Sequence, residues 1–207
     1  KGIQSISEKD KDEIRKRWFG SVVLHGTGES RIDLSPEEQA YLTKKGTINM
    51  CVLPDWLPYE RINEVGTQEG IGDEMIQLVA RRIGTPIELV PTAEWGESLK
   101  NIKDRVCDIL PIAMDVPSRR ETMTFSRPYI VEPFVIATRA DELFVKNIEA
   151  IGGRPVGIIK DYAFTELLRN SYPDLNVVDV ESAHDGLKRV RRGELFGYID
   201  SMPTIGY

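Results

Sequence analysis

The stretch VCDILPIAMDVPSRRETMTFSRPY, residues 106–129, decides the fold of this chain. It opens with an apolar run over 106–113 that has the length of a buried strand, and Pro111 within it favours the end of a strand over its middle. A polar turn with Arg119 and Arg120 follows. A guanidinium at the carboxyl end of a buried strand is well placed to hold a planar anion by two parallel hydrogen bonds. This turn is therefore the first candidate binding site.

Upstream of this stretch, apolar runs alternate with helical patterns. Ser35 followed by Pro36 predicts a helix start, and Gly66 predicts a hairpin-like turn. The expected strands are 48–53 and 87–90, and the expected helices are 36–44, 73–83 and 95–103. This order indicates a parallel sheet with right-handed crossovers. Tyr59 and Arg119 both fall beyond the carboxyl ends of its strands, where ligands bind in such sheets.

Downstream, the run YIVEPFVIATR over 129–139 predicts a further strand, and Pro133 places it at an edge or crossover. The remaining strands are expected at 155–159 and 177–180, and the remaining helices at 163–170 and 184–192. The first residues of the chain, 1–19, predict one charged helix in which Ser7 and Asp10 form a capping box.

Composition excludes several classes. The chain has 207 residues, 41% of them apolar and 29% charged, with a net charge of −6, which is ordinary for a soluble globular protein. Acidic and basic residues are mixed, so no nucleic-acid surface is expected. No apolar run approaches the ~20 residues of a membrane helix, so no membrane contact is expected of this stretch. No signal peptide is recognised, and no spacing indicates a metal or cofactor.

Cys51 and Cys107 both fall in expected buried strands. We expect two inert buried thiols. The alternative is a disulfide if the two strands are neighbours, although adjacent parallel strands rarely offer the geometry that it needs.

The segment DILPIAMDVPSRRETMTFSRPYIVEPFVIATR, 108–139, resembles the core of type II periplasmic solute-binding domains, which reads roughly D-(apolar)-(T/S)-x-T-x-E-R-x-x-x-(apolar)-x-F-S-x-P-Y. The segment LSPEEQAYLTKKGTINMCVLPDWLPYE, 34–60, is similar to the start of one branch of them. That branch comprises the Venus-flytrap sensor domains of bacterial histidine kinases and diguanylate cyclases. The resemblance extends with gaps from about 34 to 207.

The resemblance implies an α/β fold with two lobes, periplasmic-binding-protein-like, in which parallel-rich sheets are flanked by helices. The first lobe is then 34–138, and the second is 139–207, truncated before the return to the first lobe. The opening sequence KGIQSISEKDKDEIRKRWF resembles the last helix of such a domain. Residues 1–33 are therefore expected to be the tail helix of a preceding module plus a linker. The alternative for 1–19 is a solvated linker helix. Ile14 and Trp18 are expected to dock that helix on a first lobe, in its own or a neighbouring molecule.

The resemblance also implies ligand contacts. Arg119 would hold a carboxylate, Tyr59 would pack on the ligand and Trp56 would line the rim. The alternative is that both rings simply cover the end of the sheet. In the second lobe, Asp161 and Tyr162 occupy the start of a helix at which the family often binds a carboxylate, and Asp161 is better suited to an amine. Trp95, near a helix start, is equally suited to the ligand cleft and to the core.

Three positions depart from the family pattern. The hydroxyl residues before Arg119 are replaced by Met114 and Val116, and the second-lobe threonine positions are Tyr162 and Ala163. The family's amine-binding acid falls by register on Ser201, beside Asp200. A shift of one residue turns a side chain to the other face of a strand, so Asp200 is not assured of facing the ligand.

The resemblance thus predicts an extracytoplasmic sensor domain in an inner-membrane-anchored receptor. It would bind a small solute, an amino acid or another small carboxylate, by lobe closure, and signal to an output module such as a histidine kinase. Its partners would be that solute and a neighbouring sensor module or a second copy. The alternatives are a ligandless transmitting module and a transport-type binding protein. No catalysis is expected of the domain, because the acids Asp55, Asp73, Asp161 and Asp200 accompany no recognisable nucleophile–base pair.

Overall fold

The computed structural model describes residues 6–19 and 31–207, and within the first helix it describes side chains as far as Ile14. The predicted packing of Trp18 and most of the predicted linker, 20–30, lie outside the described residues. The chain forms two compact units, Lys1–Val131 and Glu132–Tyr207.

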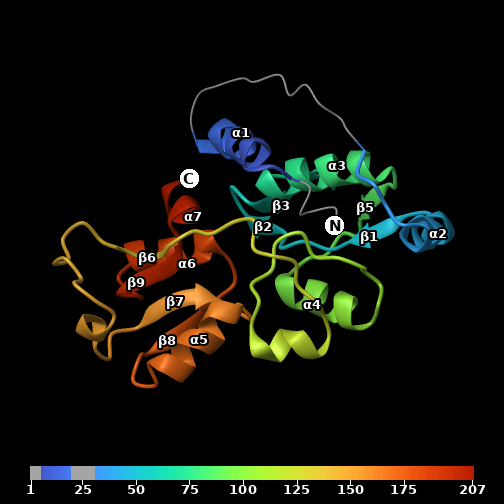
Figure 1. Cartoon of the computed structure of the whole chain (residues 1–207). Helices are drawn as coiled ribbons and strands as arrows, with labels where there is room; N and C mark the ends of the chain where they lie inside the picture. Colours follow the sequence, from blue (N-terminus) through green and yellow to red (C-terminus); the bar gives the residue numbers. More distant parts are fainter. Residues whose placement is uncertain (1–5, 20–30) are drawn as a thin grey trace. The chain divides into compact units, whose positions relative to one another are not determined.

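The first unit contains a small parallel sheet, a short antiparallel sheet and the helices that pack on them (Figure 1). Its elements are α1 (Glu8–Phe19), α2 (Pro36–Lys45), β1 (Ile48–Met50), β2 (Asp55–Trp56), β3 (Glu60–Ile62), β4 (Gln68–Glu69), α3 (Ile71–Ile83), β5 (Ile87–Leu89), α4 (Trp95–Lys103) and the 3-10 helix η2 (Pro117–Glu121). Strand β1 pairs in parallel with β5, and the β2, β3 and β4 strands form an antiparallel meander.

The helix starts follow the predicted capping chemistry. Ser35 caps α2, since its Oγ accepts from the Glu38 N–H and the Glu38 carboxylate accepts from the Ser35 N–H at 2.8 Å. Ser7 and Asp10 make the same reciprocal pair before α1, at 3.1 and 3.0 Å. Each pair satisfies two backbone donors that a helix start leaves open, and both capping predictions are confirmed.

Helix α1 lies along α3 within the first unit (Figure 1). Ile6 and Ile14 are buried in one apolar cluster with side chains of α3 and with Tyr59. Arg82 of α3 forms an ion pair with Asp10 of α1 at 2.9 Å. The expected contact of Ile14 with the first lobe is therefore present. That residues 1–33 derive from a preceding module stays a prediction.

Two predictions for the 106–113 run were wrong. This run contributes one parallel bridge, Met50 to Ile109, in place of a full strand, because Pro111 has no N–H for a ladder. Cys107 therefore lies in an irregular segment after α4. Its Cα is 5.8 Å from that of Cys51, and the two residues form a disulfide. The expectation of two free thiols assumed regular adjacent strands, which the structure does not contain at these positions.

The second unit is built on a four-stranded sheet in the order β6-β9-β7-β8. Its elements are β6 (Phe134–Thr138), η3 (Glu149–Ile151), β7 (Val156–Ile159), α5 (Ala163–Ser171), β8 (Val177–Val180), α6 (Ala183–Arg191), β9 (Gly197–Ser201) and α7 (Met202–Gly206). The β7, β8 and β9 strands are parallel, and β6 is an antiparallel edge strand, as Pro133 predicted. Because β6 hydrogen-bonds to β9, the units divide between Val131 and Glu132, earlier than the expected 138–139.

Helices α5 and α6 cover opposite faces of this sheet. Phe164 of α5 stacks on Phe134 of β6, with ring centroids 4.0 Å apart. Phe134 pairs with Ser201, and Ala137 pairs with Tyr198, so the Tyr198 ring lies on the other face, where it meets α6. No described helix combines the length and the apolar character that a membrane crossing requires.

Gly186 of α6 is expected to be intolerant of a side chain. A Cβ at this position would lie 2.8 Å from Cε2 of the buried Tyr198 ring. Gly186→Ala should therefore lower the free energy of unfolding by about 2 kcal/mol through overpacking, measured by urea denaturation. Gly153→Ala is the matched control, since its Cβ would meet nothing within 4 Å. Equal stability of the two variants would contradict the close packing of α6 on β9.

Candidate functional site

Arg119 lies in η2, which begins at Pro117. Its side chain is only 9% exposed, and its guanidinium donates a hydrogen bond to the Met114 carbonyl at 3.3 Å. Arg120, next in sequence, is exposed and makes two hydrogen bonds to the Asp115 carboxylate, at 2.7 and 2.8 Å. The two adjacent arginines therefore differ in kind. Arg120 belongs to a surface ion pair, and Arg119 is held inside the unit.

Trp95 supports the Arg119 guanidinium, whose central carbon lies 5.3 Å from the centre of the indole ring. Such a contact is favourable because the face of the ring is electron-rich. Trp95 is buried at the first position of α4, and its indole N–H has no acceptor among the described residues. The sequence left the role of Trp95 open, and the structure places it beside the predicted anion-binding residue.

Trp56 and Tyr59 form a second pair. Their ring centroids are 4.5 Å apart. Tyr59 is 1% exposed and belongs to the apolar cluster beneath α3, which fits the alternative that its ring covers the end of the sheet. Trp56 is half-buried at the end of β2. Contact of either ring with a ligand stays a prediction.

Glu60 is a buried carboxyl group that no sequence pattern predicted. Its side chain is wholly buried, and Oε2 accepts a hydrogen bond from the Leu53 N–H at 3.0 Å. Burial raises the pKa of Glu60 to about 8, although the N–H groups of Leu53 and Ile112 favour the ionised form. Burial and the nearby Glu60 charge also raise the pKa of Tyr129, whose hydroxyl donates to the Pro111 carbonyl. Glu60 thus ties the segment after β1 to the segment that leads to Arg119.

In the second unit, Asp161 and Tyr162 form the turn between β7 and α5. Asp161 is exposed and has a left-handed backbone with φ of 61°, a conformation that aspartate tolerates better than most residues. Tyr162 is buried at the N-cap position of α5. Thr165, in the first turn of α5, has a buried hydroxyl without a partner among the described residues. Its signal in the sequence was only its place in the first turn of a predicted helix.

Asp200 and Ser201 end β9, and they point to opposite faces of the sheet. Asp200 is buried, and its carboxylate accepts hydrogen bonds from the Tyr198 hydroxyl and, at 2.6 Å, from the Ser201 N–H. The Ser201 hydroxyl caps α7 through the Thr204 N–H at 3.3 Å. Because β9 and β7 are parallel neighbours, these residues lie at the same edge as Asp161 and Tyr162.

Each unit therefore presents predicted residues beyond the carboxyl ends of parallel strands. The first unit offers a buried cation and an indole donor, which suit a carboxylate. The second offers the N-terminus of α5, which suits negative charge, beside acidic side chains. No group of three or more potential metal-ligating side chains was found among the described residues.

A family model for the bacterial extracellular solute-binding proteins, family 3, matches residues 48–195. The chain belongs to this family. The matched residues make up most of both units and include Trp56, Arg119 and Tyr162. Its fold is the type II periplasmic-binding, or Venus-flytrap, fold, as the sequence predicted.

Among curated proteins, this family 3 domain is similar to the virulence sensor protein BvgS of Bordetella bronchiseptica, with 21% identity over 99% of this chain. The chain spans 16% of the length of that sensor protein.

Among solved structures, the chain is similar to the periplasmic domain of BvgS from B. pertussis, with 22% identity and a TM-score of 0.76 over 86% of this chain and 35% of that one. It is also similar to arginine-bound ArgBP from T. maritima, with 21% identity and a TM-score of 0.69 over 81% of this chain and 79% of that one. The domain therefore has the fold of solute-binding and sensor modules.

Proposed function

We propose that this chain is a sensor module outside the cytoplasm that binds a small solute bearing a carboxylate group. The observation that carries the proposal is the Arg119 guanidinium, held inside the first unit over the Trp95 ring. A planar guanidinium can hold a carboxylate by two parallel hydrogen bonds, and the adjacent indole N–H can add a third. The similarity to an arginine-bound binding protein agrees with a ligand of this class.

Two further observations support the cellular role. The Cys51–Cys107 disulfide favours an oxidising compartment, because cytosolic thiols are kept reduced. The similarity to a virulence sensor protein supports a place in a larger membrane-anchored receptor, with an output module such as a histidine kinase. In this role, ligand binding acts by its different affinity for two conformations of the domain.

Arg119→Ala is the decisive variant. We would follow thermal unfolding of the chain with each of the twenty amino acids and with short mono- and dicarboxylates. A ligand at about 100 times its dissociation constant should add roughly 2.7 kcal/mol to the wild-type stability, and Arg119→Ala should abolish this gain. Arg120→Ala is the control, since it removes an exposed guanidinium from the neighbouring position. A gain that survives in Arg119→Ala would refute carboxylate binding by this residue.

A ligandless transmitting module is the second candidate. The observation that favours it is the Ser201 hydroxyl at the family's amine-binding position, which is engaged in capping α7. A well-folded wild type that gains no stability from any compound of the panel would support this candidate over the first.

A further inference from the structure

The first unit's candidate residues lie on three loops that start from one small region. The loop after β1 carries Trp56, the loop after β5 leads to Trp95, and the segment after α4 carries Arg119. The region is the parallel ladder of β1 with β5 and the bridge from Met50 to Ile109. Contacts that hold the three loops together where they start therefore also set the distances between Trp56, Trp95 and Arg119.

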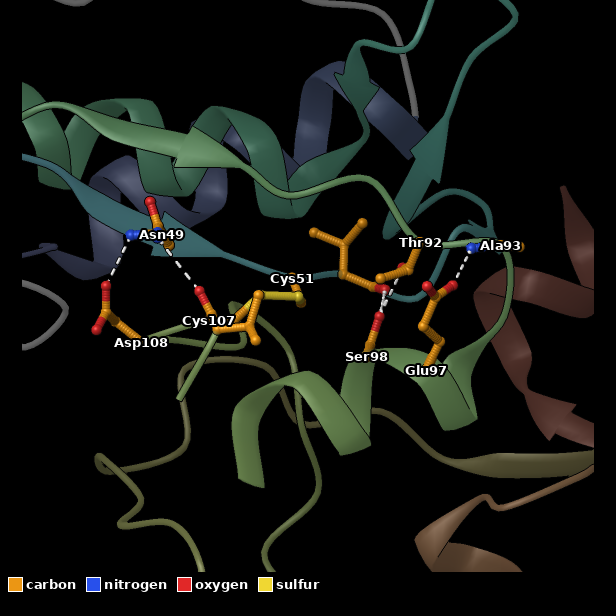
Figure 2. Close-up of a disulfide and its surroundings, with 10 residues drawn as sticks. Asn49, Cys51, Thr92, Ala93, Glu97, Ser98, Cys107 and Asp108 are labelled. Atoms are coloured by element: carbon orange, nitrogen blue, oxygen red, sulfur yellow. Dashed lines mark hydrogen bonds between the residues drawn. A yellow bond between two sulfur atoms is a disulfide. The ribbon is translucent and has the colours of Figure 1, made fainter. Parts of the chain in front are cut away.

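The disulfide joins the first loop to the third. Cys51 directly follows β1, and Cys107 begins the segment that leads to Arg119. A backbone hydrogen bond joins the same two segments, since the Cys51 N–H donates to the Ile109 carbonyl at 3.1 Å. The Asn49 N–H also donates to the Asp108 carboxylate at 2.9 Å (Figure 2).

Ser98 joins the second loop to the first. This α4 residue is fully buried, and its hydroxyl donates to the Val52 carbonyl at 2.7 Å. The Thr92 and Ser98 hydroxyl oxygens are also 2.7 Å apart (Figure 2). Val52 is next to Cys51, so the disulfide and the serine hold the same short stretch of chain from two sides.

We propose that Cys51, Cys107 and Ser98 are positioning residues that set the relative placement of Trp56, Trp95 and Arg119. This inference rests on the proposed carboxylate-binding function of the Arg119 site. Both cysteines are 0% exposed, so the sulfur atoms are shielded from solvent in the folded protein. The disulfide is therefore placed as a structural brace for the three loops.

Amide hydrogen exchange tests the brace without a ligand. Among amides that exchange by local opening and not by global unfolding, we expect those of residues 52–60 and 111–121 to exchange about tenfold faster or more in Cys51→Ala/Cys107→Ala, and those of α3 to change much less. Ser98→Ala keeps the disulfide and should accelerate exchange mainly over 92–98. Ser35→Ala is the control, because it weakens the cap of α2 in the same unit and leaves all three loop starts intact. An equal acceleration of the locally opening amides across the unit, α3 included, would overturn the proposal in favour of general stabilisation.

A binding measurement then separates this inference from the proposed function. The ligand for this measurement is a compound that stabilises the wild type in the amino-acid and carboxylate panel. The two loop variants, Cys51→Ala/Cys107→Ala and Ser98→Ala, should bind it at least about tenfold more weakly. Ser35→Ala should bind it as the wild type does. Unchanged affinity in both loop variants would overturn the positioning role even where exchange is faster. A wild type that binds no panel compound refutes the proposed function, and with it the role in positioning a ligand. The hydrogen-exchange pattern then reports only whether the disulfide and Ser98 hold the loops together.

Discussion

Replacing Cys51 and Cys107 by alanine is expected to lower the free energy of unfolding by about 4 kcal/mol. The cysteines are 56 residues apart in sequence, so the bond closes a long loop and removes many conformations from the unfolded chain. Loss of the fully buried sulfur atoms adds to the effect. Urea denaturation of the wild type and the double variant measures the difference as a lower midpoint.

The reduced wild type is the control for packing. Unfolding in the presence of a dithiol reductant opens the same loop but leaves both sulfur atoms, and it should account for most of the loss. A loss of under about 1 kcal/mol in both measurements would mean that the unfolded chain already keeps the two segments together.

The second large effect is a dependence of stability on pH that originates at Glu60. In the folded chain its pKa is about 8, above the ordinary value of 4.5. Between these two values, the folded state retains a proton that the unfolded state releases. The contribution of Glu60 to the free energy of unfolding is therefore fully present below pH 4.5. It declines as the pH rises toward 8, by up to about 1.4 kcal/mol per pH unit.

Glu60→Gln should remove this slope. The variant cannot ionise, so the difference in unfolding free energy between it and the wild type should change across the pH range. Its absolute stability is a separate matter, because the substitution also places an amide NH₂ group, a hydrogen-bond donor, among buried atoms. Glu64→Gln, at an exposed turn position, should leave the wild-type slope unchanged. Parallel pH profiles for wild type and Glu60→Gln would show that folding does not raise the pKa of Glu60.

Much of the fold could be predicted because its signals are local. The caps at Ser35 and Ser7, the helix beginning at Trp95 and the strand 177–180 follow from side chains next to one another in sequence. The 106–113 run failed because apolar content does not report whether backbone partners are present. Free thiols were favoured over the disulfide for the same reason, since its geometry depends on an irregular segment whose course the sequence does not reveal.

In the candidate site, too, residues with a local sequence signal were predicted, and those that depend on tertiary contacts were not. Arg119 was predicted from its position after an apolar run, and its burial agrees with a role inside the unit. Glu60 was missed because a glutamate in a polar turn sequence looks exposed, and only tertiary contacts enclose it. The sequence could not decide whether Asp200 or Ser201 faces the ligand, because a shift of one residue along the strand exchanges the two faces. The structure places them on opposite faces and engages both in local hydrogen bonds.

The strand order of the second unit has a consequence for biosynthesis. β9 is made after β6, β7 and β8, yet it lies between β6 and β7 and is the partner of both. Until Gly197–Ser201 has been synthesised, β6 lacks the neighbour that it has in the finished sheet, and β7 has only β8. A nascent chain that stalls before Gly197 therefore leaves open the two strand edges that β9 would pair, one on β6 and one on β7. Such open edges are the kind of surface from which aggregation starts.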